Sequence, residues 1–184
     1  MTTSLSPSPD RGVPKQLPRW ERALAVRPCQ PGDVVVSHAL GMADWAGIRR
    51  FVSRTERHDL RMRFGMPFAF DDDNTLRRMF GVDPNAGEIG WVLDARSEIA
   101  GISHRALISP SVAEIALIVR SDLKRTGIGS RLLDCLIRRA LSQGLTTLIG
   151  LVLWENYAML QLARKVGFAA SEMNGPSVQL ELRL

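Results

Sequence analysis

The chain has 184 residues, of which 45% are hydrophobic and 23% are charged, and its formal net charge is +5. This size and composition indicate one globular domain with a single substantial core. No apolar run approaches membrane-spanning length and the chain start lacks the hydrophobic core of a secretion signal, so we expect a cytoplasmic protein without a membrane partner. The first segment is rich in Ser and Pro, which predicts a disordered leader over residues 1–19 and one domain over residues 20–184.

Metal chemistry is not expected from the residue spacing. The two cysteines, Cys29 and Cys135, form neither a zinc-type spacing nor a disulfide framework. No cluster of His, Cys and carboxylate residues has a zinc-like spacing either. We therefore expect no metal, and we expect Cys135 to pack inside a helix.

The positive charge is concentrated in one segment, in which six arginines between Arg49 and Arg63 recur at near-helical intervals. Nucleic acid attracts such segments. However, aromatic residues for base stacking are sparse here, and acidic residues flank the run. A solvated helix face is the first interpretation, a docking surface for an acidic protein is the second, and we expect no nucleic acid partner.

Apolar periodicity predicts the elements of the first part of the chain. They are a strand opening at 34–36, a helix across 41–55, a short helix across 72–81, two strands ("EIGWVLD" and "EIAGISHRALI") joined by a turn at 95–97, and a strand that follows the turn at 109–111. The short helix has an Asp or Asn as its cap, and Gly81 ends it.

The later part of the chain alternates strands and helices. The apolar strand "IALIV" is followed by a helical stripe from Leu132 to Leu141, which Gly144 closes. Then come the strand "TLIGLVLW", the helix "NYAMLQLARKV" ended by Gly167, and the terminal strand "SVQLELRL". This order predicts an α/β protein in which the crossover helices make the late strands parallel.

A basic turn and two glycines separate the strand "IALIV" from its helix. The start of a helix presents unpartnered N–H groups, and glycines let the backbone approach a phosphate without a Cβ in the way. The order therefore suits an anion, although a glycine-rich connection without a ligand is equally compatible with Gly-x-Gly alone. A P-loop would need a Lys after its glycine, and a dinucleotide fold would need a third glycine where Leu132 stands.

Two motifs resemble one family. "KRTGIG" resembles the signature of the Gcn5-related N-acetyltransferase (GNAT) superfamily, and "LVLWENYAMLQLARKVGF" resembles its second motif. With the segment "LRMRFGMPF", the residues look most similar to the acetyltransferase domain of bacterial Pat-type protein lysine acetyltransferases. The resemblance implies the GNAT fold, a mixed central sheet with helices on both faces.

The resemblance also implies acetyl-CoA as acyl donor and a set of residues that hold it. The strand that bonds the pantetheine arm corresponds to Leu117, Ile118 and Val119. The turn that holds the pyrophosphate corresponds to Lys124, Arg125, Thr126, Gly127, Ile128, Gly129 and Ser130, and Asn156 matches the Asn after the next strand.

A general base is needed because a lysine amine is protonated at neutral pH. Glu114 is the expected base, since it is a carboxylate in an apolar strand and Pat-like enzymes carry a glutamate at the matching position. A carboxylate paired with an arginine near a turn is the alternative, and His104 is the reserve base. Many family members also have a Tyr acid in the second helix, where this chain has Ala163, and its one tyrosine is Tyr157.

Three functions follow from these residues. The expected one is acetyl transfer to a lysine of a protein, with an acyl-CoA synthetase as a candidate partner implied by the Pat likeness. The alternatives are acetylation of a small amine and a non-catalytic acyl-CoA-binding regulatory module. All three bind CoA, so the Gly-x-Gly turn does not separate them.

Overall fold

The computed structural model describes residues 34–37, 40–65, 72–81 and 87–184. The predicted leader and Cys29 lie outside these residues. The helices are α2 (Met42–Ser53), α3 (Arg57–Phe64), α4 (Asp73–Phe80), α5 (Ile128–Ser142) and α6 (Tyr157–Val166), with a short 3₁₀ turn, η1 (Ser121–Leu123). No helix in the described ranges is both long enough and apolar enough to span a membrane.

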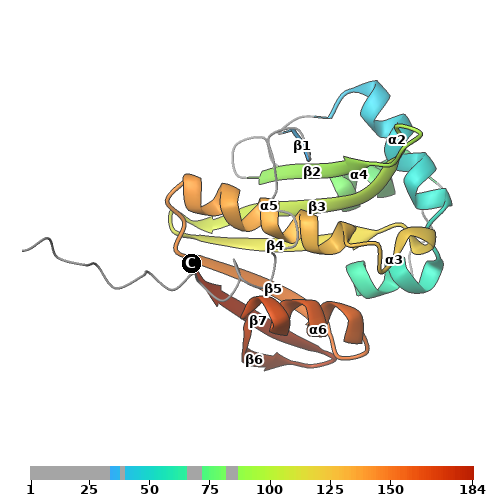
Figure 1. The fold of residues 1–184 in the computed structure, drawn as a ribbon. Coiled ribbons are helices and arrows are strands. Elements are labelled where there is room, and N and C mark those ends of the chain that lie inside the picture. The colour runs from blue at the N-terminus through green and yellow to red at the C-terminus, as the bar shows by residue number, and fades with distance from the viewer. Residues whose placement is uncertain (1–33, 38–39, 66–71, 82–86) are drawn as a thin grey trace, which may run out of the picture.

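Seven strands in the described part of the chain form one sheet (Figure 1). They are β1 (Val35–Ser37), β2 (Gly87–Leu93), β3 (Ile99–Ser109), β4 (Val112–Val119), β5 (Thr147–Leu153), β6 (Ala169–Asn174) and β7 (Ser177–Arg183). Their order across the sheet is β1-β2-β3-β4-β5-β7-β6. The strands and helices expected from periodicity are present, except that the arginine-rich segment belongs to two helices, α2 and α3.

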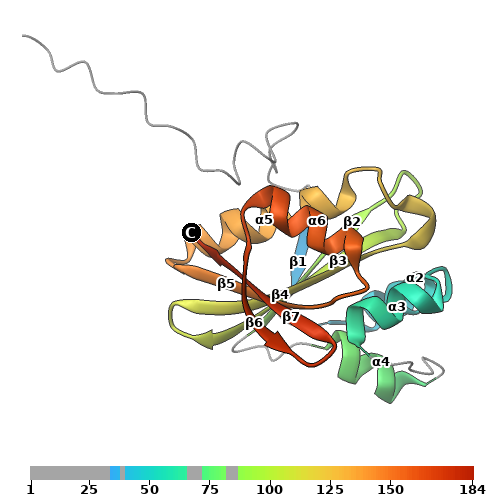
Figure 2. The same cartoon turned by 90° about the horizontal axis from the view of Figure 1, so that it is seen from below.

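Helices cover both faces of the sheet. Figure 2 shows α5 and α6 on one face, with α2, α3 and α4 on the other. Each layer has its own core: Leu133, Ile137, Ala163 and Val166 pack under α5 and α6, and Ile48, Phe51, Leu76 and Phe80 pack on the opposite side. The predicted mixed sheet with helices on both faces is therefore confirmed.

Helix caps explain where α4 and α6 begin and end. The Asp72 side chain accepts a hydrogen bond from Thr75 N at 2.9 Å, which caps the start of α4. Gly167 has φ 118°, a left-handed conformation that favours glycine, and it ends α6. The expected Asp cap of α4 and the expected glycine end of α6 are confirmed.

Close contact between α5 and the sheet depends on Gly101 of β3. A Cβ at this position would lie 2.8 Å from Cγ2 of Ile128 and 2.9 Å from Cδ1 of Leu132. Both atoms belong to the first turns of α5. The glycine therefore fixes how near the start of α5 lies to the strands.

The central strands β4 and β5 pair in parallel over a short stretch only. The partners are Val112 with Thr147, Ala113 with Leu148, and Glu114 with Ile149. Beyond Glu114 no ladder is formed between the two strands, so they part. The predicted parallel pairing is thus correct for β4 and β5.

The prediction of parallel late strands is wrong for β7, which pairs antiparallel with β5 along its whole length. The reason is an unpredicted strand, β6, after α6. The chain turns back at Gly175, φ 54°, and inserts β7 between β5 and β6. The β6 segment "AASEMN" is exposed and has little apolar alternation, so periodicity does not reveal it.

Cys135 in α5 also differs from expectation. It was expected to pack inside a helix and to take no part in a disulfide framework; it does lie in α5, but it is disulfide-bonded. Spacing did not reveal this bond, because a pair of cysteines far apart in sequence carries no framework signal.

Candidate active site

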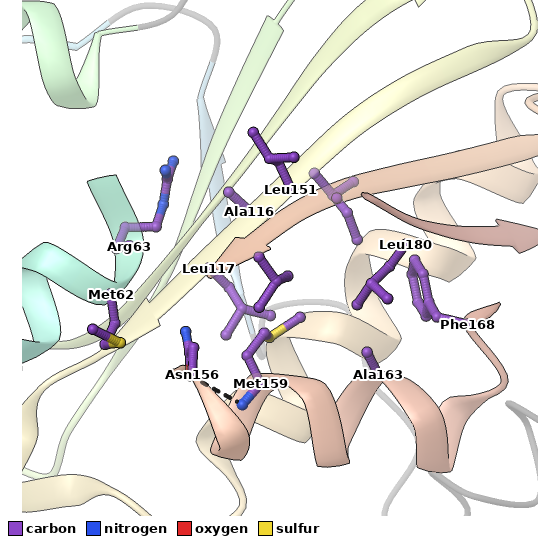
Figure 3. A pocket seen from close by; sticks show the side chains of 13 residues that line it. Met62, Arg63, Ala116, Leu117, Leu151, Asn156, Met159, Ala163, Phe168 and Leu180 are labelled. Carbon is purple, nitrogen blue, oxygen red and sulfur yellow. Dashed lines mark hydrogen bonds between the residues drawn. The ribbon is translucent and has the colours of Figure 1, made fainter. Parts of the chain in front are cut away.

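A pocket lies where β4 and β5 part, and its free space is about 430 Å³ including the opening to solvent. The lining comes from α3 (Met62, Arg63), β4 (Ile115–Leu117), β5 (Gly150–Val152), α6 (Asn156, Met159, Ala163), Phe168, and Leu180 of β7. Figure 3 shows α3 on one side of the pocket and α6 on another.

The parting leaves backbone groups of both strands facing the pocket. Residues 115–117 and 150–152 lie beyond the last paired residues, Glu114 and Ile149. Their peptide groups on this side have no ladder partner, although buried backbone groups need one. A ligand rich in amide groups would supply those partners.

The glycine turn builds an anion-binding helix start. Gly127 has φ 90° and is the N-cap of α5, with no side chain to cap the helix. The first helical bond runs from Arg131 N to Gly127 O at 3.0 Å, so the N–H groups of residues 128–130 have no intrahelical partner. Arg125, φ 61°, adds a second left-handed residue just before the helix. Such an arrangement of backbone dipoles attracts anions.

The two glycines have different roles. Gly127 requires its positive φ and has open space around it. A Cβ on Gly129 would lie 3.6–3.9 Å from side-chain atoms of Leu162, Val119 and Leu117. These distances are ordinary van der Waals contacts, and the Cβ would lie between side chains of β4 and α6. The expectation that both glycines keep a Cβ out of the phosphate path therefore needs correction for Gly129, whose Cβ would face apolar side chains.

Lys124 lies in the turn but its ammonium is already engaged. Its Nζ forms an ion pair with Asp59 of α3, and Ser121 Oγ donates to the same carboxylate at 2.5 Å. The Asp59 side chain is only 6% exposed. Lys124 therefore fastens α3 to the turn, in addition to adding positive charge near the helix start. Thr126 Oγ1 donates to Leu123 O at 2.6 Å, which closes the turn itself.

Buried Arg120 supports the same turn from the end of β4. Its Nε donates to Asp122 Oδ1 at 2.7 Å, and its Nη2 donates to Asp94 Oδ2 at 2.9 Å. A third bond reaches Ile99 O at 3.4 Å. These bonds join β4, η1 and the β2–β3 turn, so they hold the start of the loop that leads to Gly127 in place.

Three predicted donor-binding residues on the strand have different surroundings. Leu117 is half-buried and lines the pocket. Ile118 packs in the core under α2 and α4, so only its backbone can serve a ligand. Val119 is half-buried, and its side chain approaches the position of a Gly129 Cβ.

Asn156 is placed both to cap α6 and to line the pocket. Its Oδ1 accepts a hydrogen bond from Met159 N at 3.2 Å, as the dashed line in Figure 3 shows. The donor amide of Asn156 is left for another partner. The structure thus brings Asn156 and Leu117 together at one pocket, with the glycine turn at the end of the same strand.

Glu114 is the last residue of β4 that pairs with β5. Its partners across the sheet are Ala106 of β3 and Ile149 of β5, and its side chain is exposed. Within the described residues the carboxylate makes no hydrogen bond and no ion pair closer than 4.0 Å. The alternative of a carboxylate held by an arginine is therefore not what the geometry shows. Glu114 does not itself line the pocket, but the next residue, Ile115, does.

His104 is unsuited to the role of reserve base. Its Nε2 lies 3.2 Å from Phe80 O, which can only accept, so Nε2 carries the proton. The remaining lone pair, on Nδ1, accepts a hydrogen bond from Arg63 Nη2 at 2.9 Å. Burial, together with the Arg63 charge, lowers the His104 pKa to about 3. His104 is therefore neutral at pH 7 and has no free lone pair.

Ala163 occupies the place of the usual tyrosine and leaves no acid there. It is fully buried and lines the pocket beside Phe168. Tyr157 opens α6 and is 72% exposed, and it is not among the lining residues. Tyr157 therefore does not replace the missing side chain.

The sequence did not identify the α3 side of the pocket. Met62 and Arg63 line it, and Arg63 contacts His104 of β3. The arginine run drew attention only as a surface feature. The apolar residues Leu60 and Met62 within the arginine run were a usable signal, because they indicate that one face of α3 is buried next to Arg63.

The comparisons with known proteins agree with this geometry. The family model for the acetyltransferase (GNAT) domain matches residues 24–169. Among solved structures, the GNAT domain of S. lividans PAT is 18% identical with a TM-score of 0.73, covering 82% of this chain and 89% of that one. Spermidine N-acetyltransferase from Vibrio cholerae, solved with CoA and spermine, is 18% identical with a TM-score of 0.64, covering 82% and 95%.

A third structure is a phosphinothricin acetyltransferase from Sinorhizobium meliloti in complex with AcCoA, 16% identical with a TM-score of 0.60, covering 83% of this chain and 89% of that one. At these identities the structures establish the fold, and the family match covers most of the chain. The sheet that parts at Glu114, the glycine turn at the start of α5 and the family match lead to one conclusion: the chain belongs to the GNAT acetyltransferase family, whose reaction is acetyl-CoA-dependent N-acetylation.

Proposed function

We propose that the protein transfers the acetyl group of acetyl-CoA to the side-chain amine of a lysine on another protein, with Glu114 as general base. The observation that carries the proposal is the position of Glu114, at the point where β4 and β5 part and on the face opposite to α5 and α6. Its carboxylate is exposed and has no partner among the described residues. It is therefore free to accept a proton from an incoming amine.

The donor would bind on the other side of the same opening. The N–H groups of Ile128, Gly129 and Ser130 would receive the diphosphate, with charge from Arg125 and Lys124 nearby. The backbone of residues 117–119 and the Asn156 amide would bond the pantetheine arm. Acetyl-CoA supplies the acetyl group as a thioester, which is activated toward attack by an amine.

The residues of the chain have three tasks in the reaction. Glu114 takes a proton from the acceptor ammonium, directly or through a water, so that the nitrogen lone pair can form the new C–N bond. N–H groups of β4 near Ile118 or Val119 stabilise the negative charge that develops on the carbonyl oxygen. No acid stands at Ala163, so the C–S bond breaks to a thiolate or to a thiol protonated by water, which the modest pKa of a thiol permits.

The acceptor is proposed to be a folded protein with acidic surroundings, such as an acyl-CoA synthetase. Most arginines between Arg49 and Arg63 are bound within the chain, which revises the cationic surface expected from the sequence. Arg61 pairs with Glu155 at 2.9 Å and 3.0 Å. Exposed Arg50 and Arg57 make no ion pair with the described residues, so they remain to attract an acidic partner.

The test is to incubate the protein with acetyl-CoA and candidate acceptors, then to read by mass spectrometry which amines gain an acetyl group. Protein lysines should be acetylated with higher kcat/KM than spermidine or other small amines. The rate should fall from low to about 0.15 M salt, where charges are screened, and fall less when Arg50 and Arg57 are changed to Ala. Arg61→Ala is the matched control. Faster acetylation of small amines would support the small-molecule alternative, and binding without turnover would support a regulatory module.

We further propose that residues 20–184 form the catalytic unit and that the reaction takes place in the cytoplasm, where acetyl-CoA and lysine-bearing proteins meet. A truncated chain that starts at residue 20 should retain kcat within about twofold of the full chain. Loss of activity in that chain would assign residues 1–19 a role in the reaction.

A further inference from the structure

Arg63 is a half-buried cation in the wall of the pocket. It lies in the last turn of α3, and its guanidinium is also stacked over the Phe64 ring at 4.7 Å. Its Nε is buried and has no hydrogen-bond partner. Figure 3 shows Arg63 on the side of the pocket away from Asn156 and Met159. This side chain therefore presents an unsatisfied donor where the pocket meets α3.

Arg63 also has no ion-pair partner in the part of the chain that the structure describes. Its one hydrogen-bond partner among the described residues is His104, which is neutral. Glu114 attracts the guanidinium electrostatically, but the two do not form an ion pair within 4.0 Å. Burial lowers the pKa of Arg63 to about 10, so it stays protonated at pH 7. A buried charge without a paired partner is destabilising, and positions of this kind are often functional.

Other carboxylates near α3 are already occupied. Asp59 is bound by Lys124 and by Ser121. Glu155 is bound in a two-point contact by Arg61. In the described part of the chain, no acid other than Glu114 faces Arg63, and Glu114 is needed for the proton. Among the described residues, no carboxylate is thus left for Arg63, which leaves room for an anion supplied by a ligand.

We infer that Arg63 binds a carboxylate of the acceptor, so that the preferred acceptor amine carries an acidic group close to it. In a protein this group is an acidic side chain beside the target lysine, and in a small substrate it is the carboxylate of an amino acid. The inference rests on the proposed acetyl transfer. Arg63 would orient the acceptor, and Glu114 would take the proton of the acceptor ammonium. The guanidinium and the carboxylate would thus have different roles in the same reaction.

The first measurement compares matched acceptors with the full chain. One pair is a peptide with lysine flanked by Glu and the same peptide flanked by Gln. A second pair is free lysine and lysine amide, which differ only in the carboxylate. In at least one pair, the carboxylate form should have a kcat/KM at least tenfold higher, mainly through a lower KM.

The second measurement replaces Arg63 and repeats the comparison of acceptors. Arg63→Met removes the charge and keeps most of the volume, so the preference should fall to about one, while Arg63→Lys should keep part of it because a charge remains. Arg61→Met, on the same helix, is the matched control and should keep the preference. Calorimetric binding of acetyl-CoA shows whether each variant is folded. If Arg63→Met does not fold, the ratios of the wild-type protein and of Arg63→Lys decide the question.

The outcomes separate this inference from the proposed function. Equal rates within both acceptor pairs, or a preference that survives Arg63→Met, would overturn the role of Arg63 and leave acetylation of protein lysines intact. A preference seen only with free lysine, and no acetylation of any peptide or protein, would support Arg63 and overturn the protein acceptor.

Discussion

The two sides of the β4–β5 opening are built differently. On the proposed donor side, the groups that would bind are backbone N–H groups at the start of α5, and the residues are contiguous from Lys124 to Ser130. On the proposed acceptor side, the groups are side chains from separate elements, Glu114 of β4 and Arg63 of α3, and His104 of β3 holds Arg63. A backbone site tolerates many side chains, whereas the acceptor site depends on each one. Side-chain substitutions should therefore change turnover on the acceptor side, whereas acetyl-CoA affinity should respond mainly to substitutions that change the backbone conformation of the turn.

The largest expected effect is on turnover when the base is removed. Glu114→Gln should reduce kcat by about a hundredfold or more, because a positioned base contributes on that scale. Affinity for acetyl-CoA should change little, since Glu114 lies on the acceptor side. Steady-state kinetics and calorimetry measure the two quantities, and the residual rate should rise with pH as free amine becomes more abundant. If Glu114→Gln had the wild-type rate at pH 7, water and not Glu114 would be the group that accepts the proton.

The donor side should respond to backbone conformation. Gly127→Val should weaken acetyl-CoA binding by at least about tenfold, roughly 1.4 kcal/mol, because a β-branched residue is strained at φ 90°. Gly129→Ala should change the affinity by less than about threefold, since its Cβ would meet neighbours at ordinary contact distance. Titration calorimetry on both variants makes the comparison. Equal losses would show that side-chain volume, and not φ, governs this turn.

His104 makes the stability of the acceptor side depend on pH near neutrality. Its folded pKa of about 3 lies below the ordinary value near 6.5, so the folded state is favoured above pH 6.5 and loses this stability as the pH falls toward 3. Between pH 7.5 and 5.5, the loss should be about 1 kcal/mol. Urea unfolding of the wild type should show this slope, and His104→Asn should reduce it. An unchanged slope in the variant would mean that other groups titrate here.

The smallest effect is expected at the mouth of the opening. Arg61→Ala breaks an exposed pair with Glu155 and should reduce the free energy of unfolding only slightly, because solvent screens exposed pairs. The effect of the substitution should shrink in high salt. A double-mutant cycle with Glu155→Ala measures the coupling between the two side chains. A large coupling that persists in high salt would make this pair a structural tie between α3 and the β5–α6 connection.

Much of the donor side was predictable because its signals are local. Gly127 and the strand before it are close in sequence, so their local geometry could be predicted from the residues, and the family resemblance added Asn156. The separate functions of Gly127 and Gly129 were not predictable, since they depend on Leu162 of α6. Likewise, the engagement of Lys124 by Asp59 joins residues far apart in sequence.

The acceptor side shows why the rest was out of reach. Glu114 was found by its carboxylate in an apolar strand and by the family resemblance. The tautomer of His104 depends on Phe80 O and on Arg63, which three different elements bring together. The second strand of the terminal hairpin, β7, was seen, but the order β5-β7-β6 requires β6, whose sequence has no strand periodicity.

The short pairing of β4 with β5 also affects how the molecule moves. Among the described residues, three ladder pairs and the bonds from Thr146 N and Thr147 N to Ser111 O join the backbones of β4 and β5. Torsion about this narrow seam would break few hydrogen bonds, so we expect the two halves to form separate cooperative units in hydrogen exchange. The amides of residues 116–119 that face the opening, and those of 150–153 that face it, would then exchange with solvent through small fluctuations. A ligand that bonds both strand edges would slow that exchange and couple the two units.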